Sequence, residues 1–221
     1  MGFHKVIEVA VGADMCTAEE AEDFLKKVPA EQPFMATSCC PSWSVMAKKL
    51  FPQFKDYISM AMTPMVLTAR LYKKDHPDVR IVFIGPCTAK KLEASRRTIR
   101  SDVDFVLTFE EMQGIFDAKG IVPSEMPVDP EEEFSTGTSL GRGFAVTGGV
   151  ANAVKEAIKE IDPDREVKIE HADGLRECRK MLQMARAGKR NGYLLEGMAC
   201  PGGCIGGGGQ PKNCLLYTSP S

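Results

Sequence analysis

The chain has 221 residues, of which 43% are hydrophobic and 26% charged, and its formal net charge is -2. Such a composition is typical of a globular protein with one large domain or two small lobes, and it lacks the basic excess of nucleic-acid-binding proteins. No apolar run approaches the roughly 20 residues that span a bilayer, and the N-terminus lacks the apolar core of a signal peptide. We therefore expect a cytoplasmic protein without nucleic-acid or membrane partners.

Predicted strands and helices alternate along the chain. Apolar runs and turn residues predict strands at 6–11, 34–38, 80–85, 105–107, 167–169 and 193–195. Caps and helical periodicity predict helices at 18–27 (N-cap Thr17), 42–50, 64–73, from about 88, from 109 (cap Thr108), 149–161 and 175–187. This alternation favours a parallel α/β fold, and the proline- and acid-rich residues 121–142 are predicted to form a long surface excursion.

The eight cysteines need an explanation in a chain of this size. A disulfide scaffold is not expected without a secretory signal, so clustered cysteines indicate metal binding or redox chemistry. Cys39–Cys40, Cys87 and Cys200 each follow the end of a predicted strand, where ligands collect in open α/β sheets. Cys200 and Cys204 lie in a glycine-rich stretch, 196–211, whose backbone can wrap closely around a compact group. Taken alone, this stretch could also be a turn with incidental cysteines.

Three segments carry a resemblance to a known family. They are Thr37-Ser38-Cys39-Cys40-Pro41-Ser42-Trp43, Gly85-Pro86-Cys87-Thr88-Ala89-Lys90-Lys91-Leu92-Glu93 and residues 196–211. Together they resemble the three signature motifs of the FeFe hydrogenases, in that family's order and roughly its spacing. The resemblance covers nearly all of the chain from Gly12 to Pro211. It implies parallel sheets flanked by helices in a two-lobed iron hydrogenase catalytic domain.

The resemblance also implies a cofactor, the H-cluster. In the family a [4Fe-4S] cubane is joined to a di-iron unit that bears carbon monoxide, cyanide and a bridging dithiolate amine. Carried over by motif, the cubane ligands are Cys40, Cys87, Cys200 and Cys204, with Cys204 shared with the di-iron unit; soft thiolates suit such clusters. Adjacent side chains of an extended segment point to opposite faces, so Cys39 is not expected to bind the same cubane. The resemblance gives Cys39 proton transfer to and from the bridging amine.

Lys90 and Met198 complete the expected cavity. Lys90 lies three residues after Cys87, on the same side of a helix start, and by resemblance it donates hydrogen bonds to a cyanide ligand. Met198 is expected to line the di-iron cavity. Core packing is the simpler interpretation for three further methionines that could line it, Met60, Met62 and Met65.

A proton route to a buried site is expected through acids and a hydroxyl. Aligning residues 12–15 with the family places Glu20 and Asp23 near the two acids of this route, with Ser59 at the hydroxyl position. A shift of one residue would substitute Glu19 or Glu22. Alternatively, an acidic first helical turn only complements the helix dipole.

The chain departs from the family's pattern at one motif position and at its ends. The second motif usually opens with methionine, where this chain has Gly85, and this removes a thioether expected beside the di-iron unit. We expect residues 1–213 to be an FeFe hydrogenase catalytic domain that is N-terminally truncated and incomplete at both ends. Residues 214–221 look like a translated sequencing adapter and are expected to be a non-native tail.

The activity implied by the resemblance is reversible interconversion of H2 with protons and electrons. Ferredoxin or another redox carrier is the expected electron partner, and maturation proteins would install the di-iron unit. The alternative is a hydrogenase-like iron–sulfur protein that carries only a [4Fe-4S] cubane for assembly or electron transfer, in which Cys39, Lys90 and Met198 would have no role. A hydrogen sensor is a third hypothesis. A structural zinc protein fits least well, because it leaves the cavity motifs unexplained.

Overall fold

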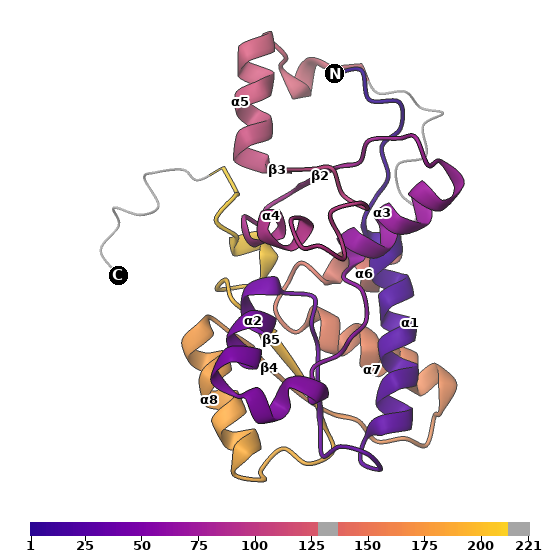
Figure 1. Ribbon diagram of the computed structural model, residues 1–221, viewed down its shortest axis with the longest axis vertical. Coiled ribbons are helices and arrows are strands. Elements are labelled where there is room, and N and C mark those ends of the chain that lie inside the picture. The colour runs from indigo at the N-terminus through magenta and orange to yellow at the C-terminus, as the bar shows by residue number, and fades with distance from the viewer. Residues whose placement is uncertain (128–136, 212–221) are drawn as a thin grey trace.

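A computed structural model describes residues 1–127 and 137–211, which form two sheets at different heights along the long axis (Figure 1). The first sheet has the order β1-β5-β4, with bounds Met35–Ala36, Tyr193–Met198 and Lys168–Asp173. The second pairs β2, Val82–Gly85, with β3, Phe105–Thr108. Both sheets are parallel, which confirms the predicted fold class of parallel sheets flanked by helices.

Helices surround both sheets. In the described residues the α-helices are α1 Ala10–Lys27, α2 Pro41–Leu50, α3 Pro64–Asp75, α4 Ala89–Ala94, α5 Phe109–Lys119, α6 Ser139–Gly143, α7 Gly149–Ile161 and α8 Leu175–Arg186. Short 3-10 helices are η1 Pro52–Tyr57, η2 Pro123–Glu125 and η3 Cys204–Gly206. The helices expected at 42–50, 64–73, 149–161 and 175–187 are confirmed to within two residues at each end.

The central strand β5 of the larger sheet is buried on both faces, and its consecutive side chains, which point to opposite sides, enter two different core clusters. Leu194 on β5 packs with Phe24 of α1 and Ile158 of α7. Its neighbour Leu195 packs on the other face with residues of α2 and α8, including Leu182. All of these side chains are fully buried. This sheet therefore holds β5, and the segment that follows it, in a rigid frame.

The smaller sheet packs on α3, where Met65, Val66 and Ala69 form the centre of a separate core cluster. Its strand β2 was expected to be a parallel-sheet strand; the pairing is confirmed, and its apolar residues are half-buried. The predicted cap Thr108 is also confirmed, since its hydroxyl accepts from the Glu111 N–H and the Glu111 carboxylate accepts from the Thr108 N–H. This reciprocal capping fixes the start of α5.

The predicted strand at 6–11 and the predicted N-cap Thr17 are wrong. Residues 10 and 11 already belong to α1, and Val6 is 61% exposed. Thr17 lies inside α1, where its hydroxyl donates to the Ala13 carbonyl 2.9 Å away. The helix forms because its buried face, spaced as in Ala13, Ala21 and Phe24, packs on α7 and α3. No strand of the described residues is hydrogen-bonded to this segment in a sheet.

The predicted surface excursion at 121–142 contains η2 near its start and α6 near its end, and its residues 128–136 lie outside the described part of the chain. The predicted tail, 214–221, lies outside it as well. Over the residues that the structure describes, no helix has both the length and the hydrophobicity needed to cross a bilayer.

Candidate metal centre

Each cysteine-bearing segment follows the carboxyl end of a strand, as predicted from the sequence. Cys39–Cys40 follow β1, Cys87 follows β2, and the 200–204 loop follows β5. Since β2 belongs to the smaller sheet, the group draws on both sheets. In Figure 1 the segment after β5 runs toward α4, between the levels of the two sheets.

Cys204 is the point where these segments meet. Burial raises the pKa of its thiol to about 12, with smaller contributions from the nearby Cys40, Cys87 and Cys200, while the positive charge of Lys90 acts in the opposite direction. Cys40 and Cys204 pack on the same core cluster, and the Ala199 N–H, beside Cys200, donates to the Cys40 sulfur at 3.4 Å. The Gly209 N–H donates to the carbonyl of Pro86, the residue before Cys87. These contacts bring together the segments that carry the four predicted ligand cysteines.

Glycines let the 205–210 segment approach the second motif through its backbone. The Gly209 N–H donates to the Pro86 carbonyl at 2.9 Å, and the Glu110 N–H donates to the Gly209 carbonyl at 3.0 Å. A Cβ on Gly207 would lie 2.4 Å from the Pro86 oxygen, closer than any side chain can come. Because glycines have no side chain, the loop after β5 can come close enough to form backbone hydrogen bonds with the start of α5 and with the residue before Cys87.

Cys39 and Cys40 have different surroundings, as the extended backbone predicts. The Cys40 sulfur accepts a hydrogen bond from the Ala199 N–H at 3.4 Å. The pKa of Cys39 is raised well above its usual value, first by burial and then by the negative charges of Glu20 and Glu196. Cys40 therefore contacts the segment that carries Cys200, whereas Cys39 lies within range of the charges of two buried acids, and both cysteines pack on the core cluster that contains Met198.

Glu20 is the acid that α1 buries. Its side chain is 3% exposed, while Glu19 and Glu22 are exposed, so the helix phase turns Glu20 toward the core and the two alternative acids toward solvent. Burial raises the pKa of Glu20 to about 7, and a hydrogen bond from the Ser59 hydroxyl acts against this rise. Because α1 begins at Ala10, Glu20 lies in mid-helix, and the alternative of an acidic first turn does not apply to it.

Ser59 and Asp23 lie on opposite sides of Glu20 in the expected route. Ser59 is buried and held beside β1 by a hydrogen bond from its N–H to the Ala36 carbonyl at 2.7 Å. Asp23, one turn along α1, forms an ion pair with Lys27 at 2.5 Å and is 30% exposed. The charge of Asp23 contributes to the raised pKa of Glu20, so the two acids are electrostatic neighbours.

Lys90 is buried and points back to the first motif. Its ammonium donates to the Cys39 carbonyl at 3.2 Å and to Glu93 Oε2 at 2.6 Å. Glu93 is itself only 3% exposed, so the two charges form a buried pair one helical turn apart. Lys90 thus connects the second motif to the first.

Met198 lies in a small core cluster beside three of the cysteines. It is 2% exposed and packs with Ala13, Phe144 and Val150, and Cys39, Cys40 and Cys204 contact the same cluster. Among the further methionines, Met65 packs in the core below β2, but Met60 is 75% exposed, so core packing is wrong for Met60. Met198 is the methionine that the fold places at the cysteines.

At Gly85, where the family usually has methionine, the structure leaves no room for a side chain. A Cβ at this buried position would lie 2.8 Å from the ring of Phe83, which belongs to the same strand. The aromatic ring therefore occupies the volume into which a side chain at position 85 would extend. A longer side chain at 85 requires Phe83 to move.

Sequence reasoning gave no role to two buried acids of the motifs, Glu93 and Glu196. Glu196 is fully buried on β5, and its carboxylate accepts hydrogen bonds from Gly148 and Ala151. Ionisable residues are seldom buried without a partner, so the acid within the apolar run of β5 could have indicated a buried carboxylate with hydrogen-bond donors around it. The sequence could not name the partners, which lie far away along the chain.

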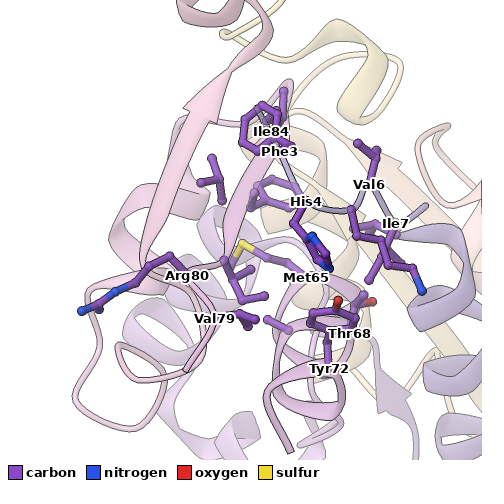
Figure 2. A pocket seen from close by; sticks show the side chains of 16 residues that line it. Phe3, His4, Val6, Ile7, Met65, Thr68, Tyr72, Val79, Arg80 and Ile84 are labelled. Atoms are coloured by element: carbon purple, nitrogen blue, oxygen red, sulfur yellow. The ribbon is translucent and has the colours of Figure 1, made fainter. Parts of the chain in front are cut away.

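No three Cys, His, Asp or Glu side chains of residues 1–127 and 137–211 gather into a group that could hold a single metal ion. A pocket of about 270 Å³ lies elsewhere, between residues 3–9, α3 and β2, and Figure 2 shows Tyr72, His4 and Met65 around it. Its lining contains no cysteine of the described residues. The candidate centre is therefore defined by its cysteines and not by this pocket.

Comparison with known proteins matches residues 1–208 to the family described as "Iron only hydrogenase large subunit, C-terminal domain". The chain is 29% identical to iron hydrogenase 1 of Clostridium pasteurianum, over 96% of the chain and 44% of that protein. It is 27% identical to cytosolic iron–sulfur assembly component 3 of Rattus norvegicus, over 96% of the chain and 55% of that protein. The chain thus spans about half the length of these relatives.

A solved structure shares the fold. It is that of an apo [FeFe]-hydrogenase from Chlamydomonas reinhardtii, which superposes with a TM-score of 0.77 at 27% identity. The superposition covers 96% of this chain and 71% of that one. The similarity therefore extends over both sheets and all three cysteine-bearing segments.

Proposed function

Because the chain belongs to the family formed by the C-terminal domains of iron-only hydrogenase large subunits, we propose that it is the catalytic domain of an FeFe hydrogenase, which interconverts dihydrogen with two protons and two electrons. The observation that carries the proposal is the convergence of the three cysteine-bearing segments: Cys39, Cys40 and Cys204 pack on one core cluster, the Cys40 sulfur accepts from the residue before Cys200, and the 205–210 segment bonds the residue before Cys87. Residues 1–213 are the proposed extent of the domain.

The donor set fits the proposed cofactor. Cys40, Cys87, Cys200 and Cys204 would hold a [4Fe-4S] cubane, and Cys204 would also bind the di-iron unit of the H-cluster. Support comes from the soft thiol donors and from the glycine backbone that closes around them at Gly207. When bound, the H-cluster supplies the electron transfer and the cleavage of dihydrogen.

The protein's own part is to move protons and keep water out. In this proposal Cys39 carries the proton at its sulfur, and Ser59 and Glu20 continue the route toward the more exposed Asp23. A pKa of about 7 lets Glu20 exchange between its acid and its base form near neutral pH, as a proton-transfer residue must. Its hydrogen bond with Ser59 supports this order of residues.

Lys90 and Met198 would shape the cavity of the di-iron unit. The buried Lys90 ammonium is held at the Cys39 carbonyl, where it could donate to an anionic ligand such as cyanide. Met198 would exclude water, which its burial beside Cys39 and Cys204 supports. Neither role is needed for a cubane alone.

Partners and location follow from the same proposal. Ferredoxin or a similar redox carrier would exchange electrons with the cubane, and maturation proteins would install the di-iron unit. A cytoplasmic location is also proposed, and the cytosolic assembly relative is consistent with it.

The second candidate function is a protein that carries only the [4Fe-4S] cubane, for iron–sulfur assembly or electron transfer. It is favoured by one specific finding: the assembly component from Rattus norvegicus is 27% identical, close to the 29% of the clostridial hydrogenase. A difference between 27% and 29% identity does not distinguish a hydrogenase from an iron–sulfur assembly protein. The residues beyond the cubane ligands, Cys39, Lys90 and Met198, favour the hydrogenase.

The test is reconstitution with iron and sulfide, then with a synthetic di-iron precursor, followed by infrared spectroscopy. Cys40→Ser and Cys204→Ser each remove one proposed ligand and should abolish the carbonyl and cyanide bands. Cys178→Ser is the control, because this buried thiol packs in the same core cluster as Cys40 but is not a proposed ligand, and its hydroxyl can keep the bonds to the Ala172 and Met198 carbonyls; it should keep the bands. Hydrogen–deuterium exchange from D2 then measures turnover.

A cubane signal without carbonyl and cyanide bands would support the cluster-only protein and contradict the hydrogenase. Bands that persist in both ligand variants would contradict the assigned ligand set. Bands that depend on both cysteines, together with exchange of D2, are the expected result.

A further inference from the structure

Two carboxylates lie on the neighbouring strands β4 and β5, close to the segments that hold the 200–204 loop. Glu196 lies on β5 and Asp173 is the last residue of β4. In the parallel register Asp173 pairs with Met198, and His171 pairs with Glu196, so the two acids are close to each other in the sheet. Among the described residues, the hydrogen bonds of both carboxylates go to partners other than the cysteine sulfurs.

Glu196 anchors the start of α7. Its two carboxylate oxygens accept from the Gly148 N–H at 2.8 Å and from the Ala151 N–H at 2.7 Å. The first N–H groups of a helix have no partners within the helix, and its positive dipole end favours an anion. Since Glu196 is fully buried, the loss of these bonds cannot be compensated by water. The position of α7 relative to β5 is therefore fixed at this point.

The segment just before α7 is bonded to the cysteine loop. The Ile205 N–H donates to the Ala145 carbonyl at 3.1 Å, and the Thr147 N–H donates to the Gly202 carbonyl at 3.2 Å. Between these bonds, Gly203 approaches so closely that a Cβ on it would lie 2.6 Å from the Ala145 oxygen. Residues 145–147 thus form a backbone brace on both sides of Cys204.

Asp173 accepts hydrogen bonds both from this brace and from the cysteine loop. One carboxylate oxygen accepts from the Gly202 N–H at 2.7 Å and from the Thr147 hydroxyl at 3.3 Å. Glu196 therefore fixes the brace through α7, and Asp173 fixes it directly to the loop.

We infer that Glu196 and Asp173 are positioning residues, which hold residues 145–147 and thereby set the place of Cys200 and Cys204. The metal-binding part of this inference rests on the proposed function; the mechanical part concerns the chain alone. If Glu196 only capped α7, its loss would speed hydrogen exchange at the start of α7 and leave exchange in the 200–204 loop unchanged. If it also positions the loop, exchange should become faster in both.

The experiment is hydrogen exchange followed by mass spectrometry on the cluster-free chain, with three variants. Glu196→Gln keeps the shape but offers one acceptor oxygen to two donors. Asp173→Ala removes the second contact, and Glu170→Gln is the control, because Glu170 lies on β4 in an ion pair with Arg190 away from the loop. The reduced cubane of each variant is then examined by electron paramagnetic resonance.

We expect exchange in residues 199–206 to be about tenfold faster in Glu196→Gln and in Asp173→Ala, as loss of a charge-assisted hydrogen bond predicts, and unchanged in α8 and in the control. After reconstitution, both variants should show a shifted or broadened cubane signal and about tenfold faster loss of iron to a chelator. A merely structural cap would leave that signal unchanged.

Faster exchange confined to residues 148–152 in Glu196→Gln would overturn the inference for Glu196. If Glu196→Gln unfolds throughout, the inference is tested by Asp173→Ala alone. Unchanged hydrogen exchange in residues 199–206 of Asp173→Ala would then overturn the inference. If the unaltered chain binds no cubane, the proposed function fails, while the exchange data still decide whether the two acids hold the loop.

Discussion

The indole ring of Trp43 packs directly on the backbone of Gly197, so that a Cβ on Gly197 would lie 2.2 Å from the ring. Trp43 is fully buried, and its Nε1–H donates to the Thr37 carbonyl at 3.0 Å. This contact joins the helix after Cys40 to the strand before Cys200. Two motifs far apart in the sequence thus share one rigid aromatic contact.

Gly197→Ala is expected to destabilise the chain by about 1–3 kcal/mol, because the added methyl group overlaps a ring that has no room to move. Urea unfolding followed by circular dichroism measures the change. The control is Gly114→Ala in α5, where a Cβ meets no atom within 4 Å and the helix is expected to gain about 0.5–1 kcal/mol. Equal stability of Gly197→Ala and the unaltered chain would contradict the tight contact.

Glu20 makes stability depend on pH. Its pKa rises from 4.5 unfolded to about 7 folded, chiefly through burial, with Glu19, Glu196 and Asp23 adding to the rise and Ser59 opposing it. Between these two pH values the folded state holds a proton on Glu20 that the unfolded state releases. The contribution of Glu20 to the free energy of unfolding is therefore fully present below pH 4.5 and is lost as the pH rises to about 7. The loss is on the order of 3 kcal/mol.

Glu20→Gln removes this titration, so its stability should exceed that of the unaltered chain at pH 8 and change less between pH 5 and pH 8. Urea midpoints at both pH values measure it. Glu19→Gln, at an exposed neighbour, serves as the control and should retain the original pH dependence. A Glu20→Gln profile parallel to the original one would contradict the raised pKa.

The buried pair of Lys90 and Glu93 should respond strongly to loss of one partner. Glu93→Gln leaves the buried ammonium without its counter-charge and is expected to cost about 3 kcal/mol. Lys90→Met combined with Glu93→Leu should cost much less than the sum of the single changes. Calorimetry of the unaltered chain, Lys90→Met, Glu93→Leu and the double variant measures the coupling, and the same measurement on Glu93→Gln gives the cost of the unpaired ammonium.

An exposed pair with the same spacing provides the matched control. Lys159 and Glu156 lie three residues apart on α7 with their side chains nearly half exposed, so Glu156→Gln should cost less than about 1 kcal/mol. Similar costs for the buried and the exposed pair would show that burial does not strengthen the Lys90 contact.

Cys39→Ala separates proton transfer from cluster binding. Under the proposed function it should keep the iron content and the infrared bands but lower D2 exchange by about 100-fold or more, the usual loss when a general acid–base group is removed. Cys178→Ala, at a buried thiol on α8, is the control for loss of a buried sulfur. Loss of the cubane in Cys39→Ala would instead assign Cys39 to metal binding.

Much of the fold followed from local patterns. The apolar runs at 80–85 and 193–195, and the cap at Thr108, were recognisable because strand burial and capping depend on neighbouring residues. The placement of Cys87 and Cys200 after strands followed from the same runs. The prediction of a strand at 6–9 was wrong because the apolar residues there suit a strand. Only the absence of a hydrogen-bonded partner strand in the described fold decides against one.

The sequence by itself determined the chemistry of the centre: thiols at strand ends, a lysine one turn after Cys87, and glycines where backbones must meet. The tertiary structure alone decided which acids are buried or hydrogen-bonded near the cysteines. Packing of α1 on α7 sets the helix phase that buries Glu20 and leaves Glu19 exposed. The register of β4 with β5 brings Asp173 to the 200–204 loop, and Glu196 to the start of α7. These choices depend on burial and on hydrogen bonds between residues far apart in the chain, which no local pattern contains.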